Sequence, residues 1–324
     1  MKKLLIIGLA ALSACMAGCK NDDWGFPDYE YQSVYFAYQY PVRTITLGED
    51  VFDTSLDNAH KCQIMATVGG SYSQKEDVTV NFTVDPIRAQ NLLFQAGGDQ
   101  VTVMPSSYYS LSSNKMVIPK GKLIGGVEVQ LTDAFFADPK ALKNTYVIPV
   151  KITSIAGADS ITRGKDFVLY AIKYVNTWHG NYLRRGKDVI VGKNGNTALN
   201  QNLIRHQPFV EKDQVIKLNS RSLSDVELPL TFKDSNGQNV NTSITLKFDG
   251  SGNCMVNSTV AGTVVTGTGK FIKRGEKQSW GNADRDAIYL KYELDMNLMH
   301  VSTTDTLVLR DRAVTMETFT PVSQ

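Results

Sequence analysis

Short runs in which apolar and polar residues alternate recur along most of the chain, and they predict β-strands. The segment 78–84 shows this pattern clearly, because Val78, Val80, Phe82 and Val84 would share one face of an extended chain. The other runs are equally rich in β-branched and aromatic residues and are separated by turn residues. In the first half of the chain the predicted strands are 34–38, 63–68, 78–84, 127–131, 147–152 and 167–174.

The second half has the pattern of a meander that begins near residue 176. Asp249 and Gly250 supply the turn of a predicted hairpin. The predicted strands are 243–248, 253–260, 262–273, 287–296, 301–310 and 314–319, with a polar loop over 274–286. Helices are predicted only over 87–95, after Pro86, and as a single turn over 138–143. Strands without intervening helices favour antiparallel sandwiches or barrels, so we predict an all-β protein of two domains.

The N-terminus is typical of an export signal. Two lysines precede an apolar run, and small residues then lead to Cys15 and Cys19. The apolar run is too short to span a bilayer. A cysteine after small residues resembles a bacterial lipobox, and the acidic residues after Cys19 resemble the surface-export tag of Bacteroidetes lipoproteins. We therefore expect a signal peptide over 1–19, a tether over 20–32 and lipid on Cys19, with Cys15 and a plain signal peptide as the alternatives.

The charge distribution argues against a nucleic-acid partner, and the cysteine content argues against a disulfide framework. The chain has 34 basic and 32 acidic residues, a formal net charge of +2, and no long run of one sign, so nothing indicates a nucleic-acid partner. Beyond the leader only Cys62 and Cys254 remain. They fall in different predicted domains, so we expect buried thiols rather than a disulfide.

Motifs for catalysis or for a bound metal are missing from the sequence. The four histidines, at 60, 179, 206 and 300, lack the spacing of zinc ligands, and no nucleophile elbow or phosphate-binding loop is present. A glycosidase needs two carboxylates across a cleft. Asp284 with Asp286, and Asp305 with Asp311, come nearest to such a pair, but we expect turn chemistry and solvated charge there. We predict neither an enzyme nor a cofactor or metal site.

Sugar recognition requires an aromatic platform and a few planar polar groups. Trp280 is an isolated aromatic residue in the polar loop, close to Asn282, Asp284 and Arg285. These four residues are the main candidates for glycan binding, with structural capping of the domain end as the alternative for Trp280. Trp178 is a further candidate, although a tryptophan beside glycine at a first strand more often plugs the end of a barrel.

Two stretches carry a family resemblance. Residues 104–121 with 127–132 and 145–150 resemble the N-terminal module of Bacteroidetes outer-membrane lipoproteins encoded beside SusC- and SusD-like glycan uptake genes. Residues 267–273, 279–282, 287–292 and 305–312 resemble the module that often follows it. The resemblance implies an Ig-like β-sandwich over 33–175 and an antiparallel β-sandwich or barrel-like meander over 176–324.

The same resemblance implies a role at the cell surface. We expect a lipid-anchored outer-membrane protein that binds an oligosaccharide or polysaccharide without catalysis, near a SusC/SusD-like importer. The alternatives are a structural, assembly or adhesion subunit, and an unrecognised glycoside hydrolase.

Overall fold

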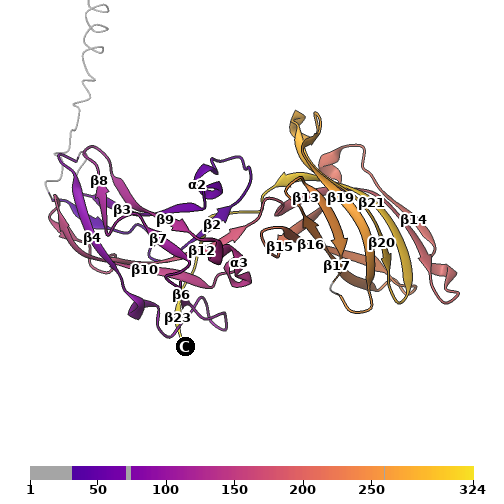
Figure 1. Cartoon of the computed structure of the whole chain (residues 1–324), viewed down its shortest axis with the longest axis horizontal. Coiled ribbons are helices and arrows are strands. Elements are labelled where there is room, and N and C mark those ends of the chain that lie inside the picture. The colour runs from indigo at the N-terminus through magenta and orange to yellow at the C-terminus, as the bar shows by residue number, and fades with distance from the viewer. Residues whose placement is uncertain (1–30, 71–73, 259) are drawn as a thin grey trace, which may run out of the picture.

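The computed structural model describes residues 31–70, 74–258 and 260–324. Two β-rich bodies lie side by side along the long axis of the molecule (Figure 1). The all-β prediction is confirmed. The lipidation prediction for Cys19 or Cys15 lies outside the described residues. No helix in the described ranges is long and apolar enough to cross a membrane.

The first body is a β-sandwich. Its strands are β1 (Ser33–Tyr35), β2 (Pro41–Thr46), β3 (Lys61–Gly69), β4 (Val78–Val84), β6 (Thr102–Val103), β7 (Tyr109–Leu111), β8 (Lys115–Ile118), β9 (Ile124–Leu131), β10 (Tyr146–Ala156), β11 (Ser160–Ile161) and β12 (Phe167–Val175). Strands β1, β3 and β9 form one layer, and β4, β10, β12 and β2 form the other, with β8 joining them. Side chains from both layers fill one core. Alternation is as predicted in β4, where Val78, Val80 and Phe82 are buried.

Short helices close the sandwich. They are α2 (Ser55–Asn58), α3 (Asp133–Ala137), η1 (Pro86–Ala89) and η2 (Pro139–Leu142). The predicted turn over 138–143 is confirmed by η2, but the predicted helix over 87–95 is wrong beyond Ala89. Asn91 has a φ of 54°, and the next residues form β5 (Leu92–Leu93). This segment covers the outer face of β10 and β12, which explains why both strands are apolar on both faces.

The second body is a barrel. Its strands are β13 (Gly180–Gly192), β14 (Gln201–Arg205), β15 (Gln214–Ser220), β16 (Asp225–Lys233), β17 (Asn239–Phe248), β18 (Asn253–Asn257), β19 (Val264–Glu276), β20 (Arg285–Asp295) and β21 (Met299–Asp311). Pairing of β13 with β21 closes a sheet of eight strands around an apolar core. The remaining short helices are η3 (Thr197–Leu199), η4 (Val210–Lys212) and η5 (Trp280–Asn282).

Strand β13 changes partner halfway along its length. Residues 180–184 pair with β15, whereas residues 186–190 pair with β14. Gly186 lies at the change of partner with a φ of 158°, and a Cβ there would lie 2.1 Å from the carbonyl oxygen of Thr304. The sequence therefore needs glycine at the point where β14 leaves the barrel wall.

The end of the chain returns to the sandwich. The predicted strand 314–319 does not extend the second module. Instead β22 (Glu317–Thr318) pairs with β2, and β23 (Val322–Ser323) pairs with β5. Phe319 is buried there against Phe94 and Tyr40. The predicted second module over 176–324 therefore includes a tail, from Val314 onward, that connects it back to the first module.

Candidate functional site

The polar loop between β19 and β20 is held in a fixed shape by two aspartates. Asp284 accepts hydrogen bonds from the backbone N–H of Gln278, at 3.1 Å, and from the Lys277 ammonium, at 3.0 Å. Asp286 accepts from the backbone N–H of Arg274, at 2.7 Å. These bonds stabilise a loop in which Arg274 and Gln278 have positive φ. The turn chemistry predicted for Asp284 and Asp286 is present.

Trp280 is half-buried, and its contacts fix a neighbouring guanidinium. Its indole N–H donates to the carbonyl oxygen of Leu309, at 3.0 Å. The guanidinium carbon of Arg285 lies 3.7 Å from the ring centroid, and Nε of Arg285 donates to the Trp280 carbonyl at 3.1 Å. One face of the indole is therefore covered by Arg285 and is closed to a ligand. Asn282 is exposed at the end of η5, with a φ of 53°.

Arg285 also lines a groove between the two bodies, with a volume of about 700 Å³. We call this the Phe52–Arg285 groove. The sandwich contributes the loop from Glu49 to Phe52, and the barrel contributes Arg274, Asp284, Arg285 and Asp286. The end of β21 and the first tail residues form its remaining wall. Two of the four candidates from the polar loop, Asp284 and Arg285, therefore line one groove, whereas Trp280 supports it from behind.

Phe52 was not identified from the sequence. This residue is 45% exposed, and Val51 beside it is 98% exposed. The signal was available, because Phe52 is an isolated aromatic residue among acidic and small residues, as Trp280 is. What the sequence does not show is that the loop with Phe52, 228 residues before Trp280, lines the same groove as the loop with Trp280's neighbours Asp284 and Arg285.

Trp178 has a structural position. Its ring stacks on Phe248 with centroids 4.2 Å apart and an interplanar angle of 9°, and it meets Phe271 edge-on. These contacts place it against the barrel core, where it plugs one end. The structure does not bring Trp178 together with the Phe52–Arg285 groove.

A buried ionic network inside the barrel was also not anticipated. Asp305 accepts from Nε of Arg184, at 2.9 Å, and from the Tyr292 hydroxyl, at 3.1 Å. Arg205 of β14 bonds both Asp305 and Asp188. The expectation of solvated charge at Asp305 is wrong, because this residue faces the barrel interior. Two arginines balance two aspartates, so the network is neutral and holds β14 against the barrel.

The thiols of Cys62 and Cys254 are free and buried in separate cores, as predicted, and burial raises the pKa of each to about 12. Within the described ranges, no group of three or more His, Cys, Asp or Glu side chains is placed to hold a metal ion. The carboxylates that line the Phe52–Arg285 groove are largely engaged. Glu49 pairs with Lys273, and Asp311 accepts from the side-chain amide of Asn181 at 2.7 Å.

Comparisons with known proteins match both halves of the chain. Residues 177–313 match the model of a domain of unknown function, DUF5627, and residues 29–159 match a model described as an N-terminal domain. No curated protein matches the chain.

Three solved structures from Bacteroides are among those that match the chain. A Bacteroides ovatus protein of unknown function is 42% identical, with a TM-score of 0.85 over 91% of this chain and 100% of that one. A second B. ovatus protein of unknown function is 12% identical, with a TM-score of 0.43 over 90% and 100% of the two chains. An auxiliary nutrient binding protein from Bacteroides thetaiotaomicron is 13% identical, with a TM-score of 0.40 over 83% and 90%. Because the chain is 42% identical to the first of these proteins and covers its whole length, it belongs to the same family as that protein, and in this chain DUF5627 forms the second domain.

Proposed function

We propose that this protein is a non-catalytic glycan-binding lipoprotein of the bacterial cell surface, and that oligosaccharide or polysaccharide binds in the Phe52–Arg285 groove. One observation carries the proposal. An exposed aromatic ring from the sandwich and a guanidinium fixed by a tryptophan of the barrel line the same groove.

The two side chains supply complementary contacts to a sugar. A pyranose ring has an apolar face that packs on a flat aromatic ring such as Phe52. Arg285 presents a planar fork of N–H donors. Because Trp280 holds the Arg285 guanidinium by stacking and through the bond to Nε, little side-chain entropy is lost when the terminal N–H groups bind a ligand. Asp50 lines the groove and provides acceptor oxygens for sugar hydroxyls.

The carboxylates of the groove favour binding over hydrolysis. A glycosidase needs a general acid whose pKa is raised. Here the hydrogen bond from Lys273 lowers the pKa of Glu49, and the hydrogen bond from Lys277 lowers the pKa of Asp284. Both groups are therefore ionised acceptors rather than proton donors at neutral pH.

The proposed location rests on the leader, which resembles a lipoprotein signal, and on the route of the chain. The described part begins at the end of the sandwich that lies away from the barrel (Figure 1). A lipid at the N-terminus would hold that end near the membrane and leave the groove and the barrel farther out. Many tethered copies would compensate for weak binding at each site through their effective concentration.

The proposal is tested by affinity electrophoresis and calorimetry against a panel of neutral and acidic polysaccharides. Phe52→Ala should weaken binding about tenfold, in line with the loss of one aromatic contact. Phe209→Ala is the matched control, because Phe209 is 64% exposed and does not line the groove. Retention on a neutral glycan that Phe52→Ala leaves unchanged would contradict this site, and release of shortened sugar products would contradict the absence of catalysis.

A structural or assembly subunit is the second candidate. It is favoured by exposed apolar side chains on and after β14, namely Leu203, Ile204 and Phe209. Failure to bind any glycan in the panel would favour this function over the first.

A further inference from the structure

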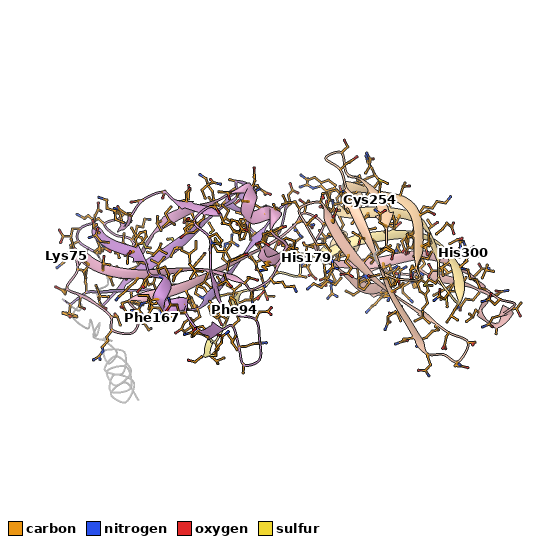
Figure 2. All side chains as sticks on the ribbon, turned by 60° about the horizontal axis from the view of Figure 1, so that its bottom comes forward. Lys75, Phe94, Phe167, His179, Cys254 and His300 are labelled. Atoms are coloured by element: carbon orange, nitrogen blue, oxygen red, sulfur yellow. The ribbon has the colours of Figure 1, made fainter. Side chains whose placement is uncertain are left out.

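A second groove lies at the junction of the two bodies, with a volume of about 970 Å³. The sandwich contributes η2 and the residues after it, and the barrel contributes the end of β15. Lys217, Ala313 and Val314 line both grooves, so the start of the tail runs between them. We call this second space the lysine groove. His179, which lies at the junction in Figure 2, is in its wall.

Positive charge is in excess in the lysine groove. Lys140, Lys143, Lys173, Lys217 and Arg221 line it, against Asp99, Glu227 and Glu317. Two of the cations are paired, because Lys173 bonds Glu317 at 2.8 Å and Arg221 lies 3.5 Å from Glu227. In the part of the chain that the structure describes, Lys140, Lys143 and Lys217 form no salt bridge. Three lysines without a salt bridge therefore line one groove, in which Asp99 is the only carboxylate without a salt bridge among the described residues.

One uncharged group adds hydrogen-bonding capacity. His179 accepts at Nδ1 from the backbone N–H of Ser220, at 3.2 Å. The neutral ring therefore carries its proton on Nε2 and is a donor there.

The state of His179 agrees with a positive potential in this groove. Burial, together with the charges of Lys217, Arg312 and Lys173, lowers its pKa to about 3. The imidazole is therefore neutral at physiological pH. An anion bound beside His179 would offset the effect of those three cations on the pKa of the imidazole.

We propose that the lysine groove binds an anionic oligosaccharide, one that carries carboxylate or sulfate groups, through Lys140, Lys143 and Lys217. The groove is too large for a single inorganic anion, and three separate ammonium groups suit a ligand with several anionic groups. Among the described residues that line it, no aromatic ring is exposed, since Tyr174 and His179 are buried, so recognition here is by charge and hydrogen bonds rather than by stacking. That the anionic ligand is a sugar rests on the proposed function. The preference for an anion rests on the lysines of the groove alone.

The test uses the full mature protein and three probes at matched ionic strength: a tetragalacturonate, a heparin tetrasaccharide and inorganic sulfate. Calorimetry should show binding of at least one tetrasaccharide, weakened about tenfold or more in Lys140→Gln/Lys143→Gln. Lys75→Gln/Lys122→Gln, which removes two exposed lysines from the sandwich without touching either groove, should leave binding unchanged. Binding of the tetragalacturonate alone would indicate recognition of carboxylate groups, whereas binding of the heparin tetrasaccharide alone would indicate recognition of sulfate groups.

A second readout does not depend on affinity. With ¹³C-labelled histidine, the acidic tetrasaccharide should move the NMR signal of His179 and leave those of His60, His206 and His300 in place. The proposal is overturned if neither tetrasaccharide binds, if both double variants bind equally well, or if inorganic sulfate saturates the same sites at the same concentration. Phe52→Ala should not affect this binding, so failure of the lysine groove and failure of the Phe52–Arg285 groove are distinguishable.

Discussion

Arg312 donates from Nη2 to the carbonyl oxygen of Asn176, at 2.6 Å, and so joins the exit of the barrel to the segment through which the chain enters it. Its other donors reach the carbonyls of His179, Glu49 and Leu47. No carboxylate takes part in these bonds, and burial lowers the pKa of the guanidinium. Four carbonyls replace its hydration shell and hold the wall of the Phe52–Arg285 groove to the barrel.

Replacement of Arg312 should therefore destabilise the junction. Arg312→Ala leaves four carbonyls without their donor in a buried position, and we expect a loss of about 3–5 kcal/mol in the free energy of unfolding, measured by urea denaturation. Arg312→Lys keeps the charge but not the planar fork, so it should recover only part of the loss. A variant as stable as the parent would show that the junction is held by other contacts.

Trp280 and Arg285 should act as one unit in binding. Trp280→Ala frees the Arg285 guanidinium, so we expect a loss of affinity of about tenfold although the indole face toward Arg285 never meets the ligand. In a double-mutant cycle, Trp280→Ala and Arg285→Ala should not be additive, whereas Phe52→Ala and Arg285→Ala should be closer to additive. Additive losses for the tryptophan–arginine pair would mean that Trp280 contacts the sugar itself.

The tail should stabilise the sandwich rather than the barrel. Phe319 is 8% exposed and packs on Phe94, at a centroid distance of 4.7 Å. Phe319→Ala should lower the free energy of unfolding by about 3–5 kcal/mol. Hydrogen exchange should place the loss in β2, β5 and β12, with the barrel strands unchanged. Faster exchange confined to β13–β21 would contradict this assignment.

Stability should fall in acid because of His179. Its pKa is about 3 in the folded protein, below the usual value of 6.5, so the unfolded chain binds a proton that the folded one excludes. The contribution of the neutral imidazole to the free energy of unfolding is therefore fully present above pH 6.5. It declines as the pH falls from 6.5 toward 3, by at most about 1.4 kcal/mol per pH unit. His179→Asn, which can keep the acceptor for Ser220, should show a shallower decline in urea midpoints between pH 7 and 4. Parallel pH curves for the two proteins would contradict this.

The local pattern predicted most of the strands, because the alternation of buried and exposed side chains in a strand is visible in residues that are adjacent in the sequence. Val78, Val80 and Phe82 are an example. Contacts between distant segments were not predictable in this way. Closure of β13 on β21 and the return of Phe319 to the sandwich depend on pairings that no run of residues reveals.

The candidate site likewise has a part that the local sequence predicted and a part that depends on contacts between distant segments. The polar loop with Trp280 and Arg285 was found as an isolated aromatic residue among polar ones, but the closed face of the indole depends on side-chain geometry. Phe52 carried the same local signal and gained its position only through the junction that Arg312 holds. Asp305 looked like a strand-flanking surface charge, because its partners Arg184 and Arg205 come from strands far away in sequence.

A crystal structure with a bound oligosaccharide, chosen as the one best retained in affinity electrophoresis, is the most direct test of glycan binding between the two domains. We predict one sugar ring packed on Phe52 with hydroxyls bonded to the terminal nitrogens of Arg285. Sugar density on the barrel away from both grooves, with Phe52 and Arg285 free of contacts, would contradict it.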